Sequence, residues 1–322
     1  MTDRLRRLGA TDLKIAPLVL GGNVFGWTAD RDTSFAVLDA FVDAVDAQGG
    51  GAMIDTADVY SAWVPGHSGG ESESVIGEWL RASGKRDRVL IATKVGMLPG
   101  EGGEKLAPAR IAAACEASLR RLGTDRIDLY FAHQDDDSVP QEAVLEAFAA
   151  LVAAGKVRVL GASNFHAARL KSANDAARAA GLPRYDALQP EYNLVSRHRF
   201  EGELQDYCVT ENVGVVPYYG LASGFLTGKY RSRDDLSQSV RGGRMADLLE
   251  GKGAAVLAAM DAVVGETGAT HAQVALAWLA SQAGVTAPIA STTSVAQVND
   301  LIGALTLELS DEQQARLTDA GA

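Results

Sequence analysis

Residues 127–160 read IDLYFAHQDDDSVPQEAVLEAFAALVAAGKVRVL, and this stretch contains the pattern that decides the fold. The apolar run Ile127–Ala132 has the length of a buried strand. An amphipathic stretch of helical length, Pro140–Ala154, follows it, and a second apolar run, Val157–Leu160, comes next. A strand, a helix and a strand in this order predict two parallel strands joined by a crossover helix.

The same alternation continues along the rest of the chain. The other short apolar runs are bounded by polar residues or glycine, as buried parallel strands are. The predicted strands are Ala16–Leu20, Ala52–Ile54, Val89–Ala92, Ala187–Leu188, Gly214–Pro217 and Thr286–Ile289. The predicted helices between them are Thr33–Gln48, Glu71–Ser83, Pro108–Leu122, Ala167–Gly181, Phe200–Asn212 and Thr270–Gln282.

Helix-end signals support several of these segments. Thr270 with Gln273, and Ser310 with Gln313, have the spacing of a capping box, in which each side chain accepts or donates across the first turn. Glycines directly after predicted helices indicate left-handed terminating residues. These glycines are Gly123, Gly155 and Gly181.

Eight strands with about as many crossovers predict a closed (β/α)8 barrel, formed by residues 1–322 as a single domain. The alternative is an open doubly wound sheet, which normally carries a GxGxxG turn after its first strand, and the sequence has none. Leu5–Leu8 and Leu13–Ile15 predict a hairpin before the barrel. Extra helices are expected after strands seven and eight, at Ala254–Gly265 and after Ser310. The polar stretch Tyr230–Gly253 is long enough to be a functional loop.

Composition excludes several classes of protein. The chain has 322 residues, of which 47% are hydrophobic, and a formal net charge of −11. Such a charge repels nucleic acid, and no apolar run approaches the roughly 18 residues of a membrane helix. The first residues contain no apolar core of a secretory signal, and the two cysteines, Cys115 and Cys208, suit a reducing cytoplasm. The five scattered histidines and the absence of CxxC argue against a metal site.

Six consecutive predicted strands end in polar side chains that would share one rim of the barrel, where active sites of this fold lie. Singly, each has an ordinary structural explanation, such as a turn former or a solvated charge. Together they predict a site. These residues are Asp55 with Tyr60, Lys94, His133, Ser163 with Asn164, Gln189, and Tyr218.

This set suits proton transfer to an alkoxide. A lysine beside Tyr60 is expected to lower the pKa of its phenol, and an aspartate would keep that lysine charged. His133 would orient a substrate oxygen and stabilise charge that develops on it. Hydride transfer to or from a carbonyl is the natural partner of this step, and the hydride must come from a cofactor because no side chain donates one.

At these residues the sequence resembles the aldo-keto reductases over nearly its whole length. The segments that carry the resemblance are IDTADVY and GESESVIGEWL (54–60 and 70–80), LIATK (90–94), RLGTDRIDLYFAHQDD (121–136), GKVRVLGASNF (155–165), LQPEYNLVSR (188–197) and VVPYYGLASGFLTGKY (215–230). The resemblance implies a (β/α)8 barrel that interconverts carbonyls and alcohols with NADPH, less often NADH.

The resemblance also implies roles for individual residues. The catalytic tetrad would be Asp55, Tyr60, Lys94 and His133, with Tyr60 as the general acid. Ser163, Asn164 and Gln189 would bind the nicotinamide carboxamide, and the ring would stack on Tyr218. Other cofactor contacts would come from the loops after strands one and seven. These residues are Gly22, Asn23, Tyr219, Leu221, Ser223, Gly224, Lys229 and Arg241.

The segment IASTTSVAQVNDL (289–301) resembles the adenosine-phosphate motif of the family. Its predicted cofactor contacts are Ser291, Thr292, Thr293, Gln297 and Asp300. The motif here contains no Arg or Lys, and Gln297 stands where some members carry Arg, so a strong charge-assisted contact to a 2′-phosphate is missing from it. NADP is the expected cofactor, with NAD as the alternative.

Aromatic residues in the loops after strands one and two are candidates for a substrate-facing wall. We expect Phe25, Trp27 and Trp63 to join Tyr60 and His133 around a small or medium carbonyl compound, which the resemblance leaves open among aldehydes, ketones and sugar-like carbonyls. Two other functions remain as alternatives. One is a cofactor-sensing module like the potassium-channel β subunits, which share this fold and many of these motifs, and the other is a metal-dependent hydrolase. The intact tetrad favours the reductase.

Overall fold

A closed ring of parallel strands forms the centre of the molecule in a computed structural model that describes residues 5–238 and 242–322. Among these residues the strands follow the order β10-β3-β4-β5-β6-β7-β8-β9, and each neighbouring pair is parallel. They are β3 (Val19–Gly21), β4 (Ala52–Asp55), β5 (Val89–Val95), β6 (Ile127–Ala132), β7 (Val157–Ser163), β8 (Tyr185–Gln189), β9 (Gly214–Val215) and β10 (Ile289–Ala290).

The two ends of this sheet meet and close the barrel. Val215 of β9 forms an isolated parallel bridge with Val285, just before β10. Backbone hydrogen bonds from Thr286 N to Val215 O (2.8 Å) and from Ile289 N to Pro217 O (2.9 Å) continue this contact. The (β/α)8 prediction is therefore confirmed, and the open doubly wound alternative is not the fold.

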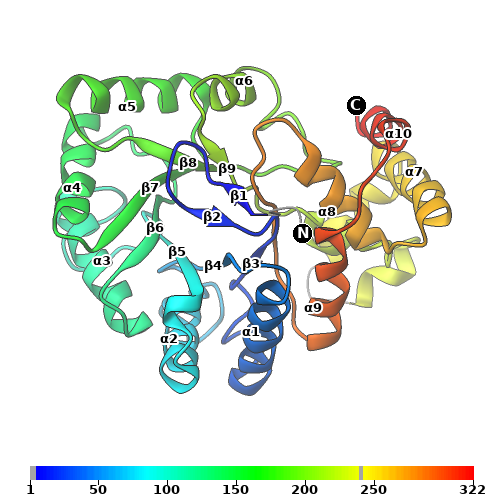
Figure 1. Ribbon diagram of the computed structural model, residues 1–322, viewed down its shortest axis with the longest axis horizontal. Helices are drawn as coiled ribbons and strands as arrows, with labels where there is room; N and C mark the ends of the chain where they lie inside the picture. Colours follow the sequence, from blue (N-terminus) through cyan, green and yellow to red (C-terminus); the bar gives the residue numbers. More distant parts are fainter. Residues whose placement is uncertain (1–4, 239–241) are drawn as a thin grey trace.

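Helices surround the strands, as Figure 1 shows. The barrel helices are α1 (Arg31–Asp46), α2 (Glu71–Ser83), α3 (Pro108–Leu122), α4 (Gln141–Ala153), α5 (Ala167–Ala180), α6 (Glu203–Thr210), α8 (His271–Ser281) and α9 (Val295–Ile302). The two expected extra helices are α7 (Lys252–Thr267) and α10 (Asp311–Ala320), which pack against each other. Short 3-10 helices are η1 (Arg86–Arg88), η2 (Ala222–Thr227), η3 (Arg233–Gln238), η4 (Gly242–Leu249) and η5 (Gly303–Leu305).

Most helix-end signals in the sequence correspond to real caps. Both capping boxes form, at Thr270 with Gln273 and at Ser310 with Gln313. Gly123 and Gly181 terminate α3 and α5 in the left-handed conformation. The predicted helix Phe200–Asn212 is longer at both ends than α6 (Glu203–Thr210). At the N-terminal end, Gly202 has a non-helical φ of 90°, so the helix begins only after it.

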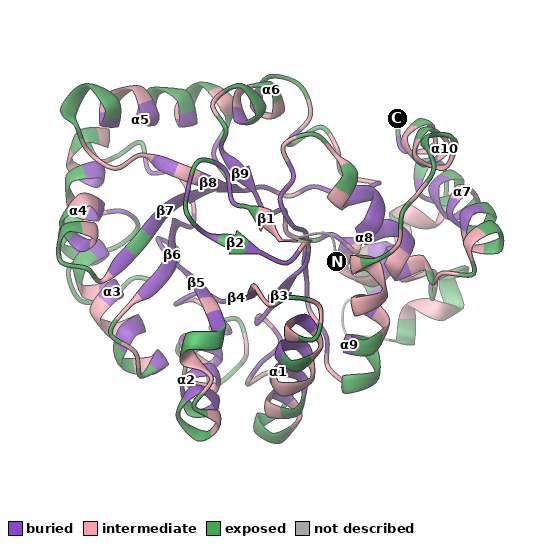
Figure 2. Ribbon diagram, in the orientation of Figure 1, coloured by how far each residue is buried: buried purple, intermediate pink, exposed green. Residues whose placement is uncertain are grey.

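The hairpin of β1 (Arg6–Arg7) and β2 (Lys14–Ile15) closes the end of the barrel where the strands begin. Leu8, Leu13 and Ile15 are almost fully buried and pack with interior residues such as Met53 and Phe131. Figure 2 shows this buried interior continuing through the strands. The opposite, carboxyl end of the strands is thus left as the open end.

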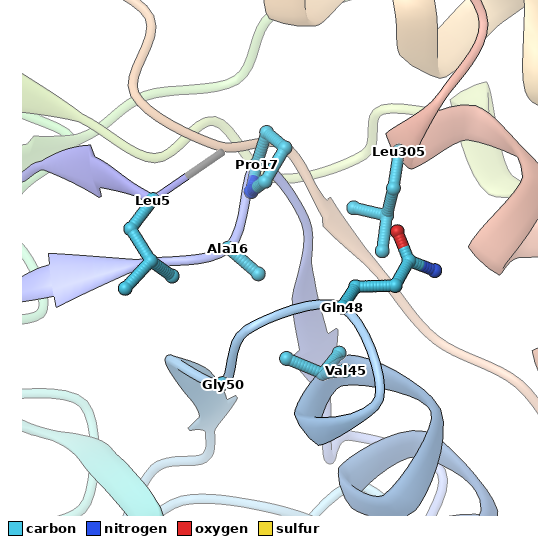
Figure 3. Close-up of a pocket in the computed structure, with 7 residues that line it drawn as sticks. All are labelled: Leu5, Ala16, Pro17, Val45, Gln48, Gly50 and Leu305. Carbon is cyan, nitrogen blue, oxygen red and sulfur yellow. The ribbon is translucent and has the colours of Figure 1, made fainter. Parts of the chain in front are cut away.

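A small cavity lies near the hairpin, at the closed end (Figure 3). Its volume of about 10 Å³ suits a single water molecule. The buried Oε1 of Gln48, one of its lining residues, has no hydrogen-bond partner among the described residues. No helix in the described part of the chain has the length and apolar character needed to cross a membrane.

Candidate active site

Three of the predicted tetrad residues form one hydrogen-bonded cluster at the carboxyl ends of β4 and β5. The ammonium of Lys94 donates to Asp55 Oδ2 at 2.7 Å and to the hydroxyl of Tyr60 at 3.1 Å. It also donates to the backbone oxygen of Thr56 at 2.7 Å. The strand register explains why Asp55 and Lys94 lie close together. Asp55 of β4 is paired with Ala92 of β5, and Lys94 lies two residues further along β5.

Burial of this cluster fixes its charges. Lys94 is 0% exposed and Asp55 is 3% exposed, so the ion pair is shielded from water. Although burial alone would lower the pKa of Lys94, the Asp55 carboxylate beside it leaves that pKa raised. A buried ammonium with all three protons donated is held in one orientation.

The Tyr60 phenol differs from the sequence expectation. Burial raises its pKa above the ordinary value, and the attraction of the Lys94 ammonium offsets only part of that effect. Lys94 does lower the pKa as expected, but desolvation of the phenolate outweighs the lysine and the net pKa is raised. In this state Tyr60 carries its proton at neutral pH and can donate it.

His133, which follows β6, completes the group. Its ring centroid lies 6.0 Å from that of Tyr60, in an edge-on arrangement. Burial, together with the nearby Lys94 charge, lowers the pKa of His133 well below its usual range, so its ring is neutral. Its buried Nδ1 has no hydrogen-bond partner among the described residues.

The predicted carboxamide-binding residues are joined to the tetrad. Gln189 Nε2 donates to Asp55 Oδ1 at 2.8 Å, and Ser163 Oγ donates to the backbone oxygen of Gln189 at 2.8 Å. Asn164, in the left-handed conformation with φ 58°, donates from Nδ2 to His133 O at 2.9 Å. The hydroxyl of Tyr218 donates to Asn164 Oδ1 at 2.8 Å. Groups from five strand ends are therefore connected in one hydrogen-bonded network.

The loop after β3 packs against the tetrad from another side. Gly22 donates its N–H to Asp55 O at 2.7 Å, and its carbonyl accepts from Ser72 Oγ at 2.7 Å. A Cβ at Gly22 would lie 3.0 Å from Asp55 O, which explains the glycine. Asn23 accepts a hydrogen bond from Ser291 Oγ at 2.7 Å, joining the first and eighth strand ends.

The loop after β9 has an unusual backbone. Tyr219, Ala222 and Ser223 have φ values between 46° and 57°, and Gly224 has φ 97°. The exposed Lys229 places its ammonium 5.0 Å from the ring centroid of Tyr230. The other predicted cofactor residues in this region are Leu221, which is half-buried, and Arg241, which lies outside the described residues.

The predicted phosphate turn precedes α9. Gln297 Oε1 accepts from the backbone N–H of Thr293 at 2.8 Å, so the glutamine carboxamide occupies a donor that an anion could use. Thr292 is 2% exposed, and its buried Oγ1 has no partner among the described residues. Asp300 instead accepts from Thr270 Oγ1 at 2.8 Å and from the Gln273 side chain, so its carboxylate is engaged with α8.

Two of the three candidate aromatic residues, Trp27 and Trp63, are at least partly exposed and lie in one aromatic group with Tyr60. Trp63 is 48% exposed and lies edge-on to both Trp27 and Tyr60, with centroid distances of 5.6 and 5.7 Å. Phe25 is 0% exposed and packs in the hydrophobic core with α1 residues. Its side chain offers no surface to a substrate, which corrects the sequence expectation for that residue.

Sequence reasoning missed the residue that shapes the Trp63 loop. The carboxylate of Glu71 accepts from the backbone N–H groups of Ser61 (3.1 Å), Ser68 (2.8 Å) and Gly69 (3.1 Å). Partial burial opposes its charge, yet these N–H groups leave the pKa of Glu71 lowered. Its position at the start of α2, directly after the loop, was the available signal.

Comparison with known proteins agrees with this geometry. The model of the aldo/keto reductase family matches residues 17–322. The chain belongs to the aldo/keto reductase family. An oxidoreductase of Bacillus subtilis without assigned function, YrpG, is 34% identical over 97% of this chain and 94% of its own length.

Two fungal relatives extend this comparison. The aldo-keto reductase AMT2 of Alternaria alternata is 31% identical over 98% of this chain and 90% of its own length. The norsolorinic acid reductase stcV of Emericella nidulans is 33% identical, over 95% of this chain and 78% of its own length. Aldo/keto reductases are oxidoreductases that generally use nicotinamide cofactors, which places this chain in that class.

Proposed function

We propose that this aldo/keto reductase reduces aldehydes or ketones reversibly to alcohols with NADPH, and that Tyr60 is its general acid. One observation carries the proposal: a protonated phenol lies 3.1 Å from a buried ammonium that is itself paired with Asp55. A neutral imidazole lies beside the same phenol. This combination can deliver a proton to a substrate oxygen and stabilise the charge on that oxygen.

The residues present fit a nicotinamide cofactor. Asn164 and Ser163 offer amide and hydroxyl groups next to the tetrad, and Tyr218 offers an aromatic ring at the same rim. Two buried polar atoms without partners among the described residues, His133 Nδ1 and Thr292 Oγ1, lie in the segments assigned to the catalytic and phosphate ends. When bound, the cofactor would supply the hydride.

The side chains of this chain would then do the following. Tyr60 donates its proton to the carbonyl oxygen as negative charge develops there. Lys94 stays charged and lowers the cost of the phenolate that results, while Asp55 holds the ammonium in place. His133, neutral in the buried site, binds the same oxygen by a hydrogen bond. The edge-on pair Trp27 and Trp63 covers the substrate and limits access of water.

The preference for NADP over NAD rests on the resemblance rather than on a charged contact in the phosphate turn. Gln297 is neutral, and its Oε1 already accepts from Thr293. Ser291, Thr292 and Thr293 would offer hydroxyl and backbone groups to a phosphate. We therefore propose NADP as the preferred cofactor with only modest discrimination against NAD.

A carbonyl screen tests the proposed function. Purified protein is mixed with NADPH or NADH and with panels of aldehydes, ketones and sugars, and oxidation of the cofactor is followed by its absorbance. We expect turnover with members of the first two panels and a higher kcat/KM with NADPH. Tight NADPH binding without turnover of any panel would instead favour the cofactor-sensing alternative.

A further inference from the structure

A second buried charge cluster lies behind the tetrad, and the mechanism above does not use it. Its central residue is Asp58, which falls between Asp55 and Tyr60 in the segment IDTADVY and is 0% exposed. The backbone N–H of Asp58 donates to Lys94 O at 3.2 Å. Asp58 is thus tied directly to the main chain of the catalytic lysine.

The side chain of Asp58 is paired with Arg110 of α3. The distance from Asp58 Oδ2 to Arg110 Nη2 is 3.3 Å, and Arg110 is 6% exposed. Asp58 Oδ1 is buried without a hydrogen-bond partner among the described residues. Burial, reinforced by the nearby Glu73, raises the pKa of Asp58 to about 7. An aspartate in this position is costly, so packing alone does not account for it.

The other N–H groups of Arg110 donate to backbone oxygens in the loop between β5 and α3. Its Nε donates to Leu98 O at 3.0 Å and its Nη1 donates to Glu101 O at 3.3 Å. This loop, residues 96–107, is mostly exposed and carries Met97, which is 38% exposed. The guanidinium therefore joins a largely exposed rim loop to the segment that bears Tyr60.

Glu73 of α2 anchors β5, the strand next to this segment. Its carboxylate accepts from Thr93 Oγ1 at 2.6 Å and from Arg121 Nε at 2.7 Å. Thr93 directly precedes Lys94 on β5, so α2 and α3 both anchor the strand that carries the lysine. Two acidic side chains and two guanidinium groups thus lie outside the strands, next to the backbone of the segments that carry Tyr60 and Lys94. They belong to Asp58, Glu73, Arg110 and Arg121.

We propose that Asp58 and Arg110 act as a positioning pair for the reaction: Asp58 keeps the Tyr60 segment aligned with Lys94, and Arg110 couples that alignment to the rim loop 96–107. This inference rests on the proposed function for its catalytic consequence, whereas its structural part does not. Asp58 is 0% and Arg110 6% exposed, so the pair would act through the placement of Tyr60 and of the loop rather than by contact with a ligand.

Two variants test the pair. Asp58→Asn keeps the size of the side chain and removes its charge, and Arg110→Lys keeps the charge but loses the fork that reaches Leu98 and Glu101. A matched control is Asp128→Asn on β6. Asp128 is 1% exposed and is paired with Arg86 at 2.9 Å, at the opposite, closed end of the strands.

Three measurements separate positioning from mere stability: kcat and KM for the best carbonyl substrate, the Kd for NADPH by fluorescence quenching, and hydrogen exchange of residues 55–63 and 96–107. We expect Asp58→Asn to lower kcat at least tenfold with the Kd within twofold. Arg110→Lys should raise KM at least fivefold. Both should speed exchange in residues 96–107, whereas Asp128→Asn should change none of these.

The proposal is overturned if Asp58→Asn keeps kcat within twofold and exchange in both segments stays as in the unaltered protein. If Asp58→Asn does not fold, the exchange rate and KM of Arg110→Lys decide the matter alone. If the unaltered protein reduces no carbonyl, the proposed function fails, yet exchange in 55–63 and 96–107 still decides whether the pair positions these segments.

Discussion

The ammonium of Lys94 donates to the hydroxyl of Tyr60 at 3.1 Å while its charge is held against Asp55. The phenol nevertheless keeps a raised pKa because it is buried. In the proposed reaction the lysine would therefore act less by ionising the tyrosine in the resting state than by stabilising the phenolate formed when the proton leaves. This distinction has consequences for substitutions of either residue.

Replacement of Tyr60 by Phe removes the proton donor and keeps the ring. We expect turnover to fall by about 10²–10⁴, the usual contribution of a general acid. NADPH binding, measured by fluorescence quenching, should stay within a few-fold. Turnover similar to that of the unaltered protein would exclude Tyr60 as the acid.

Replacement of Lys94 by Met leaves the buried Asp55 carboxylate without its cation. We expect the free energy of unfolding to fall by about 3–5 kcal/mol, measured by urea denaturation, and turnover to collapse. The double variant Lys94→Met with Asp55→Asn should recover part of the stability but none of the activity. If only KM changes in Lys94→Met, the lysine merely places the ligand.

Replacement of Gln297 by Arg would add a cation at the predicted phosphate turn. We expect the Kd for NADPH to decrease roughly tenfold and that for NADH to change little, since a charge-assisted contact needs the 2′-phosphate. Asn299→Arg, on the same helix two residues away, is the control for added charge. Equal tightening by both variants, or for both cofactors, would mean that the turn does not bind this phosphate.

The buried Asp58 predicts a pH dependence of stability. Its folded-state pKa of about 7, raised by burial and then by Glu73, exceeds the ordinary value of 3.8. Between these values the folded chain holds a proton that the unfolded chain has released, so stability falls as pH rises. Arg110 and Arg121 face the same carboxyl and oppose this effect.

The measurement compares the free energy of unfolding of the unaltered protein with that of Asp58→Asn from pH 4 to pH 8. Relative to the variant, the unaltered protein should lose on the order of 4 kcal/mol over this range. Parallel curves for the two proteins would contradict a titrating Asp58.

Much of this architecture follows from local patterns. The strand Ile127–Ala132 and the helix Glu71–Ser83 have the predicted bounds. In both, the spacing of the apolar residues and the residues that flank the segment indicate the same start and end. The strand-end rule also brings Asp55 and Lys94 together, since carboxyl ends of parallel strands share one rim. The sequence could thus predict which end of the barrel holds the site and which polar residues lie at that end.

Other features depend on contacts between distant segments. Gln189 meets Asp55 across 134 positions of the chain, and Arg110 meets Asp58 across 52. The burial of Phe25 and the desolvation of Tyr60 likewise arise only when several elements pack around them. The strand-end rule placed Gln189 and Asp55 at one rim, but no local period or spacing indicates which side chains bond directly or how deeply each is buried, so these details could not be predicted.

The hairpin under the barrel has a kinetic consequence. Because Leu8, Leu13 and Ile15 fill the end of the barrel where the strands begin, the cofactor and substrate of the proposed reaction would have to enter from the opposite end. In that case the more deeply bound ligand would bind first and leave last. Inhibition patterns in steady-state kinetics would accordingly reveal a compulsory sequence of arrivals rather than a random one.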